Sequence, residues 1–325
     1  MSPAPGTGAP DVRTGFTAAV AHRAADRDVL VRGLRAMGDD AYTLDLDWSG
    51  PHLFFGPARG SVHHHMLIAQ TLRQIGLALA HTEFAIGPSH HFLMNDLTYA
   101  VDPRHRTDLS PLRAEASCTW TARNAVRVAI SLIQRGTTFL TSDSSFSWVS
   151  DRGYRRLRGP RLESRPGPRP FPVPPSATGR HTPDEVVLGP SERPHCWELI
   201  PDTGNPALID HPVDHVPGLV IMEAVHQAAF AFIRERTGGA GTGWCPVSTA
   251  MYADRYVEFD APCWIEARAV PPLPPGAGLT APPASGDPGV LSGILTAGMP
   301  AVELTGRQRG AVVFRSVVEG VLVPD

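Results

Sequence analysis

Two long apolar segments, one in each half of the chain, constrain the possible fold more than any other feature. Residues 66–82 (MLIAQTLRQIGLALAHT) and residues 218–234 (GLVIMEAVHQAAFAFIR) both keep an almost continuous apolar surface at helical spacing. A helix that is apolar nearly all round must be buried on most of its sides. Each segment therefore predicts a central helix that other elements wrap.

Strand-like runs accompany each predicted helix. One precedes each helix, at residues 41–48 and 195–200. Four follow in each half, where β-branched and aromatic residues gather. In the first half these runs are residues 91–101, 113–123, 125–134 and 137–149, and in the second half 248–259, 263–270, 289–297 and 309–318. Both halves thus show the order strand, loop, helix and about four strands.

The two predicted helices form an internal repeat. AQTLRQ, from residue 69, can be laid over MEAVHQ, from residue 222. A repeat of this length indicates two copies of one domain rather than a solenoid. An antiparallel sheet that wraps one central helix would bury each apolar segment. We therefore predict an α+β fold, a double hot-dog in which two such units form a pseudo-dimer.

Segments rich in proline and glycine set the expected boundaries. Residues 1–22 resemble a flexible tail, and residues 158–178 contain many Pro and Arg residues, which is typical of a linker. The first hot-dog domain is then expected at residues 23–157 and the second at 179–325. Another Pro-rich stretch, residues 270–289, is expected to form a surface loop.

Composition excludes several classes of function. The 325 residues carry a formal net charge of -3, with 42% hydrophobic and 19% charged residues, as in a globular protein without a basic patch for nucleic acid. No apolar run reaches the length of a membrane span, and the N-terminus lacks the pattern of a signal peptide, so we expect a cytoplasmic location. All 29 basic residues are arginine, which leaves no lysine for a Schiff base.

Titratable residues interrupt the second helix and the loop before it. Glu223, His226 and Gln227 share one helical face, because helical neighbours lie three and four positions apart. The same spacing puts Gln70, Arg73 and Gln74 on one face of the first helix. A buried charge that lacks a partner is costly, and an unmatched Glu223 would have a raised pKa. These groups are therefore either matched to one another or used in chemistry, although a lone glutamate on a helix often faces solvent.

The sequence HPVDHVPG precedes the second helix. His211 and His215 lie within reach of a common site, and Pro217 and Gly218 mark the helix start, where free N–H groups can bind an oxyanion. Histidine, glutamate and a helix N-terminus can together perform general acid–base catalysis on an acyl group.

Other chemistries have weaker support. Residues 63–65 are three consecutive histidines, which point in different directions and do not suggest a metal site. No G-x-S-x-G elbow is present, and the four cysteines have no metal-ligand spacing and are expected to be reduced. We expect no metal and no cofactor.

The run LIDHPVDHVPGLVIMEAVHQAA, residues 208–229, resembles the second-repeat motif of the A-factor biosynthesis family, the γ-butyrolactone and butenolide signalling-molecule synthases of actinomycetes. Residues 47–101, 177–188 and 256–267 are also similar to that family, and the similarity covers most of residues 25–325. The resemblance implies two hot-dog domains, distantly similar to hydroxyacyl-carrier-protein dehydratases. It also implies transfer of a β-ketoacyl group from an acyl carrier protein or acyl-CoA thioester to a hydroxyl of dihydroxyacetone phosphate or a related acceptor, in a secondary-metabolite pathway.

The chain departs from the family pattern at three places. The family carries E-T-x-R-Q on the first helix, where this chain has Gln70 in place of the glutamate. On the second helix the family carries E-A-x-R-Q, where this chain has His226 in place of the arginine. In the loop W-P-R-x-H the arginine is also missing, although His52 is kept. These changes suggest a different acceptor or one idle site.

The leading hypothesis is an acyltransferase that uses the Glu223 site. Glu223, with His52 from the first half, would deprotonate the attacking hydroxyl, and backbone N–H groups near Gly218 would hold the thioester oxygen, while His226 orients or relays. The residues expected in the second cleft are Gln70, Arg73, His211 and His215. Arg73 is the best candidate for a phosphate contact. The expected substrate-binding residues are Gln70, Arg73, Gln74, Gly218 and Gln227.

Two alternatives remain open. The first is a hot-dog dehydratase, lyase or cyclase that acts on an acyl thioester. The second is a non-catalytic protein that binds an acyl chain or a lactone.

Overall fold

Two halves with the same order of elements make up this computed structural model. The structure describes residues 12–50, 56, 64–108, 110–238, 244–270 and 300–322. The first half contains β2 (Val31–Gly38), β3 (Ala41–Leu46), α2 (His65–Thr82), β4 (His90–Val101), β5 (Leu112–Ala122), β6 (Ala125–Gln134) and β7 (Thr137–Ser150). The second half contains β8 (Leu188–Gly189), β9 (Cys196–Leu199), α4 (Gly218–Arg236), β10 (Trp244–Ala253), β11 (Cys263–Val270), β12 (Ala301–Gln308) and β13 (Ala311–Leu322).

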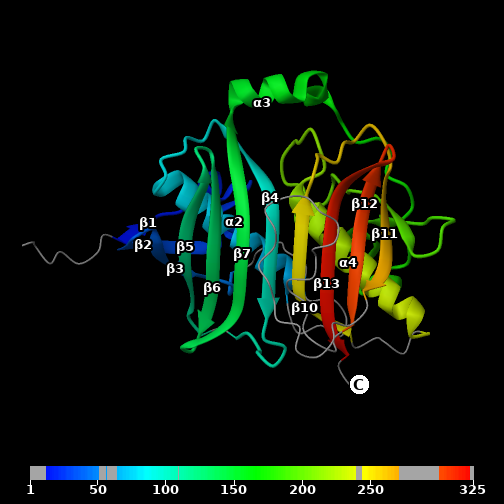
Figure 1. Cartoon of the computed structure of the whole chain (residues 1–325), viewed down its shortest axis with the longest axis horizontal. Helices are drawn as coiled ribbons and strands as arrows, with labels where there is room; N and C mark the ends of the chain where they lie inside the picture. The colour runs from blue at the N-terminus through cyan, green and yellow to red at the C-terminus, as the bar shows by residue number, and fades with distance from the viewer. Residues whose placement is uncertain are drawn as a thin grey trace, which may run out of the picture.

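One sheet runs through both halves (Figure 1). Its strand order among the described residues is β1-β2-β3-β5-β6-β7-β4-β10-β13-β12-β11-β9-β8. Read outward from the centre, β4, β7, β6 and β5 on one side match β10, β13, β12 and β11 on the other. The central strands β4 and β10 pair antiparallel, with Thr98 opposite Ala250 and Tyr99 opposite Thr249. The two copies of the repeat therefore meet edge to edge.

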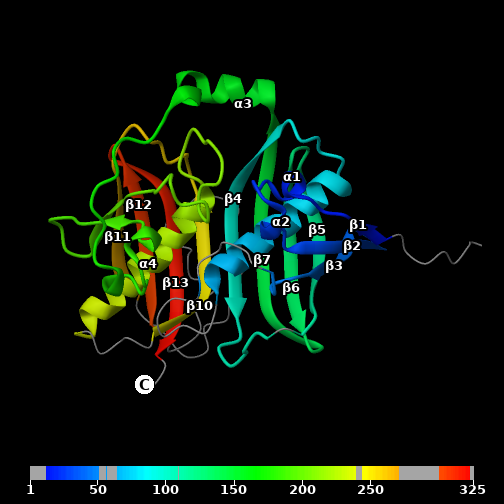
Figure 2. The same ribbon diagram turned by 180° about the vertical axis from the view of Figure 1, so that it is seen from behind.

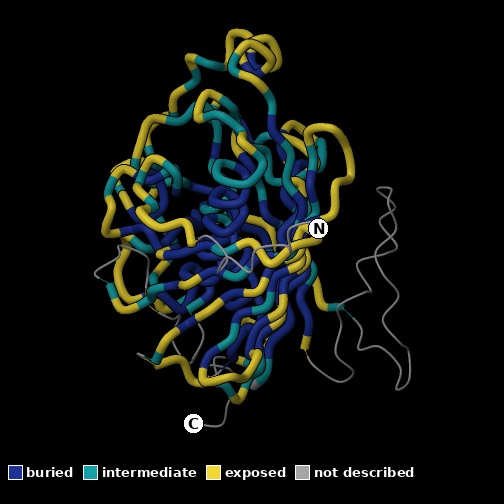
Figure 3. Tube along the Cα trace, turned by 90° about the vertical axis from the view of Figure 1, so that its left-hand side faces the viewer, coloured by how far each residue is buried: buried dark blue, intermediate teal, exposed yellow. Residues whose placement is uncertain are grey.

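The two long helices lie on the same side of this sheet, in front of it in Figure 2. Every residue of α4 from Val220 to Ile233 is buried, and so is every residue of α2 from His65 to Ala80 except Arg73. Fully burying a leucine or phenylalanine side chain stabilises a fold by roughly 1.5–3 kcal/mol. These apolar helices thus form the core, which is dark blue in Figure 3, and the double hot-dog prediction is confirmed.

Two equivalent glutamines tie each helix to its own half. Gln74 accepts a hydrogen bond from the N–H of Leu30 at 2.7 Å and donates one to the carbonyl of Asp28 at 2.6 Å. Gln227 likewise accepts from the N–H of Val187 at 2.9 Å and donates to the backbone of the second half. Each amide thus holds the segment just before a strand, β2 in the first half and β8 in the second. Substrate binding was expected of both residues, but the structure shows that the amide of Gln74 is occupied by backbone.

Some elements differ from the sequence-based expectation. Residues 12–22, assigned to a tail, include β1 (Val12–Thr14) and α1 (Ala18–Ala21). Just before the expected linker, at the end of the expected first domain, the chain forms α3 (Asp151–Arg158), which lies across one end of the sheet between the two halves (Figure 1). β12 was not predicted, and the run at 289–297 lies outside the described residues. None of the described helices is long and apolar enough to cross a membrane.

Candidate active site between the two halves

Glu223 lies in the middle of α4 and is completely buried. Its carboxylate accepts two parallel hydrogen bonds from Arg180, from Nε to Oε1 and from Nη2 to Oε2, both at 2.7 Å. Arg180 is itself only 1% exposed. The amide of Gln227 also donates to Oε1. A bidentate arginine is the partner that best matches a buried carboxylate.

The first half contributes His65 to this site. His65 is the first residue of α2, and its Nε2 lies 3.0 Å from Oε2 of Glu223 and 2.9 Å from Nη2 of Arg180. Arg180 also reaches into the first half, because its Nη1 donates to the carbonyl of Gly56 at 2.9 Å. The charged pair of the second half is thus completed by an imidazole of the first.

His226 stands beside His65 at the same junction. The two ring centroids are 4.0 Å apart and the rings are nearly perpendicular, at 86°. Nε2 of His226 lies 2.8 Å from the hydroxyl of Thr249 on β10 and 3.2 Å from the hydroxyl of Tyr99 on β4. His226 is therefore held by the two strands that join the halves.

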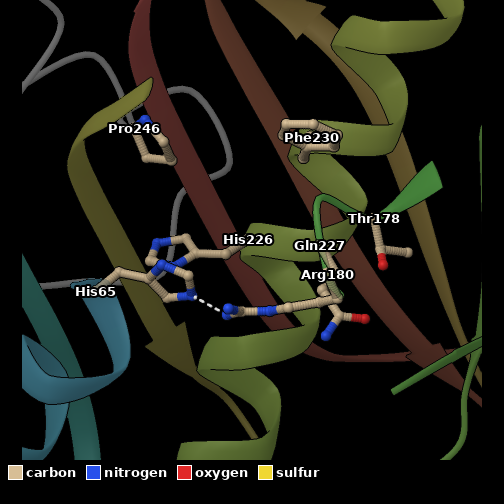
Figure 4. A pocket seen from close by; sticks show the side chains of 7 residues that line it. All are labelled: His65, Thr178, Arg180, His226, Gln227, Phe230 and Pro246. Atoms are coloured by element: carbon tan, nitrogen blue, oxygen red, sulfur yellow. Dashed lines mark hydrogen bonds between the residues drawn. The ribbon is translucent and has the colours of Figure 1, made fainter. Parts of the chain in front are cut away.

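A small cavity opens next to these side chains (Figure 4). Its lining residues are His65, Thr178, Arg180, His226, Gln227, Phe230 and Pro246. The Nδ1 atoms of both histidines are buried and have no hydrogen-bond partner in the part of the chain that the structure describes. Buried polar atoms nearly always have a partner, so two unpartnered nitrogens beside one cavity indicate a place for a ligand.

The electrostatics of the site fix the charge of each group. Burial opposes ionisation of Glu223, but the charges and hydrogen bonds of Arg180 and His65 outweigh it and hold its pKa far below the usual range. Burial lowers the pKa values of His65 and His226, so both are neutral near pH 7. Burial also raises the pKa of Tyr99, which keeps the phenol protonated. The sequence left open whether Glu223 is unmatched. In the structure Glu223 has partners and is ionised, and it is therefore a weak base.

His211 and His215 have other partners. Nδ1 of His211 lies 2.7 Å from Asp210, and the side chain is 53% exposed. Nδ1 of His215 lies 2.7 Å from Asp214. Both histidines were predicted to be catalytic, but each is held by the aspartate that precedes it, and neither bonds to Glu223.

Two aspartates, one just before this motif and one within it, anchor distant segments. Asp210 accepts from the backbone N–H of Ala24 at 2.7 Å. Asp214 accepts from Arg158 at 2.8 Å and from the hydroxyl of Tyr154 at 2.7 Å, which fastens α3 to the second half. These groups therefore hold distant segments together, and none of them contacts Glu223.

The equivalent place in the first half is built differently. Gln70, in register with Glu223, is 1% exposed, and both atoms of its amide lack a hydrogen-bond partner among the described residues. Arg73, in register with His226, is half-buried and donates to the carbonyl of Ala21 at 3.0 Å, and the loss of water around its guanidinium lowers its pKa to about 10. Arg23 pairs with Asp28 of its own half and with Asp210 of the second half. The first half thus lacks a carboxylate at this position of its helix.

One further predicted site residue, Gly218, does not line the cavity. Gly218 is five residues before Glu223, about 7.5 Å along the helix axis, so its N–H is far from that carboxylate. A Cβ atom at Gly218 would lie 2.8 Å from Cε of Met94, so a larger residue there would require the flexible end of Met94 on β4 to shift. His52 lies outside the described residues.

Comparison with known proteins connects this geometry to a family. The A-factor biosynthesis hotdog domain matches residues 9–139 and 163–267. A 2-oxo-3-(phosphooxy)propyl 3-oxoalkanoate synthase from Streptomyces virginiae is 35% identical over 77% of this chain and 86% of its own length. A synthase of the same name from Streptomyces coelicolor is 30% identical over 93% of this chain and 90% of its own length. The chain belongs to the A-factor biosynthesis hot-dog family. The resemblance in the sequence is thus confirmed, and the named relatives are enzymes.

A solved structure supports the fold of this A-factor family member. An acyl-ACP thioesterase from Bacteroides thetaiotaomicron superposes with a TM-score of 0.50 at 13% identity, over 88% of this chain and 100% of the thioesterase. At that identity the likeness shows the hot-dog fold alone.

Sequence reasoning missed two residues of this A-factor family site. His65 was considered only within the histidine triplet, because its partner Glu223 is 158 positions away. Arg180 was included only within residues 177–188, a stretch similar to the family. The repeat contained the signal for Arg180: R-A-A-D-R-D-V from Arg23 matches R-H-T-P-D-E-V from Arg180.

Proposed function

We propose that the protein is an acyltransferase that moves a 3-oxoacyl group from a thioester to a hydroxyl of dihydroxyacetone phosphate or a related acceptor. The names of its Streptomyces relatives support this reaction class. The observation that carries the proposal is the buried junction of Glu223, Arg180 and His65, whose neighbour His226 shares the same cavity. A water-poor site with an ionised carboxylate behind a neutral imidazole suits proton transfer from a hydroxyl.

His65 is the general base in this proposal. In one tautomer of this residue Nε2 accepts from Nη2 of Arg180, the proton is on Nδ1, and the ring is not a base at that nitrogen. The reactive tautomer in this proposal has its proton on Nε2 instead, donates it to Glu223 and keeps a lone pair on Nδ1 beside the cavity. This nitrogen takes the proton as the acceptor hydroxyl attacks the thioester carbonyl. The new C–O bond forms, the C–S bond breaks, and the leaving thiolate takes the proton back from the imidazolium. Atoms and charge therefore balance without a cofactor.

Glu223 supports the base and does not abstract the proton itself. Its low pKa makes it a poor base, but its negative charge stabilises the imidazolium that forms on His65. Arg180 holds the carboxylate in place with two hydrogen bonds. The role expected of Glu223 from the sequence thus passes to His65.

The thioester donor is proposed to be an acyl carrier protein, with acyl-CoA as the alternative carrier. Both present the acyl group as a neutral thioester. A buried site whose arginine charge is balanced by Glu223 suits such a group.

The test combines purified protein with 3-oxoacyl and 3-hydroxyacyl thioesters, with and without dihydroxyacetone phosphate, and identifies products by mass. We expect an ester of the phosphate acceptor. Loss of water from the 3-hydroxyacyl substrate would instead identify a dehydratase, and tight binding without turnover would identify a non-catalytic binding protein.

A histidine variant tests the assigned base. His65→Gln should lower kcat by about 10²- to 10⁴-fold, the usual contribution of general base catalysis. His195→Gln removes an imidazole that pairs with Glu235 at the surface, and should keep full turnover. Circular dichroism and thermal unfolding check that both variants are folded. Full activity in His65→Gln would refute the assignment.

A further inference from the structure

We propose that Thr249 and Tyr99 are positioning residues that hold His226 as the tautomer with its proton on Nδ1, so that this N–H binds the carbonyl oxygen of the acyl thioester. The inference rests on the proposed function and assigns a carbonyl-binding donor to the same cavity. His65 remains the base.

The geometry around Nε2 of His226 supports this tautomer. The hydroxyls of Thr249 and Tyr99 lie 2.8 Å and 3.2 Å from Nε2. Thr249 and Tyr99 face each other in the pairing of β10 with β4, and all three residues are buried. The two hydroxyls therefore reach one nitrogen from the two strands at the centre of the sheet.

Counting hydrogens decides which nitrogen carries the proton. Each hydroxyl has one hydrogen to donate, and burial removes water as an alternative acceptor. If Nε2 is unprotonated, it accepts one of these hydrogens, and the other hydroxyl can donate to its neighbour. If Nε2 carried the proton, one hydroxyl hydrogen would be left without an acceptor, at a cost of roughly 1–3 kcal/mol. The proton of His226 thus belongs on Nδ1.

The Nδ1–H then lies beside the cavity, where it can donate to a substrate. Nδ1 of His226 is buried and has no hydrogen-bond partner among the described residues, and the residue lines the cavity that His65 also lines. The ring centroids of the two histidines are 4.0 Å apart, so a donor and a base are neighbours. A fixed N–H donor stabilises the negative charge that develops on a carbonyl oxygen when a nucleophile attacks the carbon. Because His226 is neutral, the group it recognises is an uncharged carbonyl rather than a phosphate.

Nitrogen-15 NMR of the full-length protein with labelled histidine tests the tautomer directly. His226→Asn identifies the resonances of His226 by their loss. We expect the pattern of a neutral imidazole with the proton on Nδ1. A proton on Nε2, or protonation of both nitrogens at pH 7, would overturn the inference.

The same experiment tests the ligand. The probe is a 3-oxoacyl amide, in which an NH group replaces the thioester sulfur. Its addition should shift the Nδ1 resonance of His226 in the wild-type protein, and the shift should be lost in Thr249→Val. A probe that binds without moving this resonance would refute carbonyl binding. This measurement needs no turnover, so it decides the inference even if acyl transfer to a hydroxyl is not found.

Kinetics of matched variants separate positioning from a structural role. Thr249→Val removes the hydroxyl and should lower kcat about 10-fold or more with little change in KM, because one transition-state donor becomes misplaced. Thr249→Ser keeps the hydroxyl and should restore turnover, and Thr141→Val changes an exposed threonine on β7 as a control. Equal activity of the valine and serine variants at position 249, with an unchanged His226 spectrum, would overturn the inference.

Discussion

At the scale of single residues, two equivalent buried polar side chains differ sharply in their hydrogen-bond partners. Glu223 and Gln70 occupy equivalent positions on α4 and α2, and both are almost inaccessible to solvent. Glu223 is surrounded by donors from Arg180, His65 and Gln227. The amide of Gln70 has no partner among the residues described. The first arrangement stabilises a buried charge, whereas we expect the second to cost stability.

Replacing Gln70 by methionine tests that cost. The apolar side chain has a similar size and removes a buried, unsatisfied amide, so the free energy of unfolding should rise by about 1–3 kcal/mol. Acyl transfer should be unchanged, because the Glu223 site does not use Gln70. Urea denaturation and the mass-based assay measure the two effects. A loss of turnover with unchanged stability would show instead that Gln70 binds substrate.

The buried histidines make stability depend on pH. Burial lowers the pKa of His22 from 6.5 to about 4, and lowers those of His65 and His226 as well. An unfolded chain binds these protons below pH 6.5 and the folded protein does not, so stability is complete above that pH and falls as the pH drops from 6.5 towards 4.

Urea denaturation between pH 8 and pH 5 measures this dependence, and His22→Gln should flatten the curve. The range stops at about pH 5 because Glu223 and other carboxylates with lowered pKa values also lose their contribution as they become protonated at lower pH. A protein that became more stable on acidification through this range would contradict the assignment of neutral histidines.

At the scale of elements, both central helices and most strands could be predicted from the sequence. The apolar periodicity of α2 and α4 reports directly on burial, and β11 has the predicted bounds. The site was only half predictable, because helical spacing connects Glu223 with His226 but says nothing of His65. A contact between residues far apart in the chain depends on how the two halves pack, which local pattern does not encode.

The motif HPVDHVPG shows the limit of composition as a guide to chemistry. Its two histidines were predicted to be catalytic, yet each lies beside the aspartate that precedes it, and Asp214 binds Arg158 of α3 and the hydroxyl of Tyr154. Arg158 also makes two hydrogen bonds to Glu258, at 2.8 and 2.7 Å. The motif therefore helps to fix the connection between the two halves.

Removing Arg158 should test this anchoring. Arg158→Met leaves the carboxylates of Asp214 and Glu258 without their buried cation and should lower the free energy of unfolding by about 3–5 kcal/mol. Arg156→Met, on the exposed side of α3, is the matched control and should change it by less than about 0.5 kcal/mol. Chemical denaturation of both variants compares them, and equal stabilities would argue against an anchoring role for α3.

At the scale of the whole molecule, the described strands form one continuous sheet and the candidate site draws on both halves (Figure 1). His65 comes from the first half, whereas Glu223 and Arg180 come from the second. The pairing of β4 with β10 covers the strand edge that each half would otherwise expose. We therefore expect neither half to be complete as a structure or, with His65 as the proposed base, as a catalyst.

Two fragments, residues 1–166 and 167–325, test this dependence. Each alone should self-associate through its open edge strand and lack acyl transfer, and a mixture refolded together should recover it. Size-exclusion chromatography and the ester assay give the readouts. Turnover by the second fragment on its own would show that His65 is dispensable.

The fusion of the two hot-dog units into one polypeptide has a genetic consequence. In a symmetric homodimer, a substitution appears in both clefts at once, so neither cleft can change without the other. Here the codons for Gln70 and Glu223 are separate, and so are those for Arg73 and His226. One half can therefore lose its glutamate and change its role, while the other half keeps Glu223 and His226.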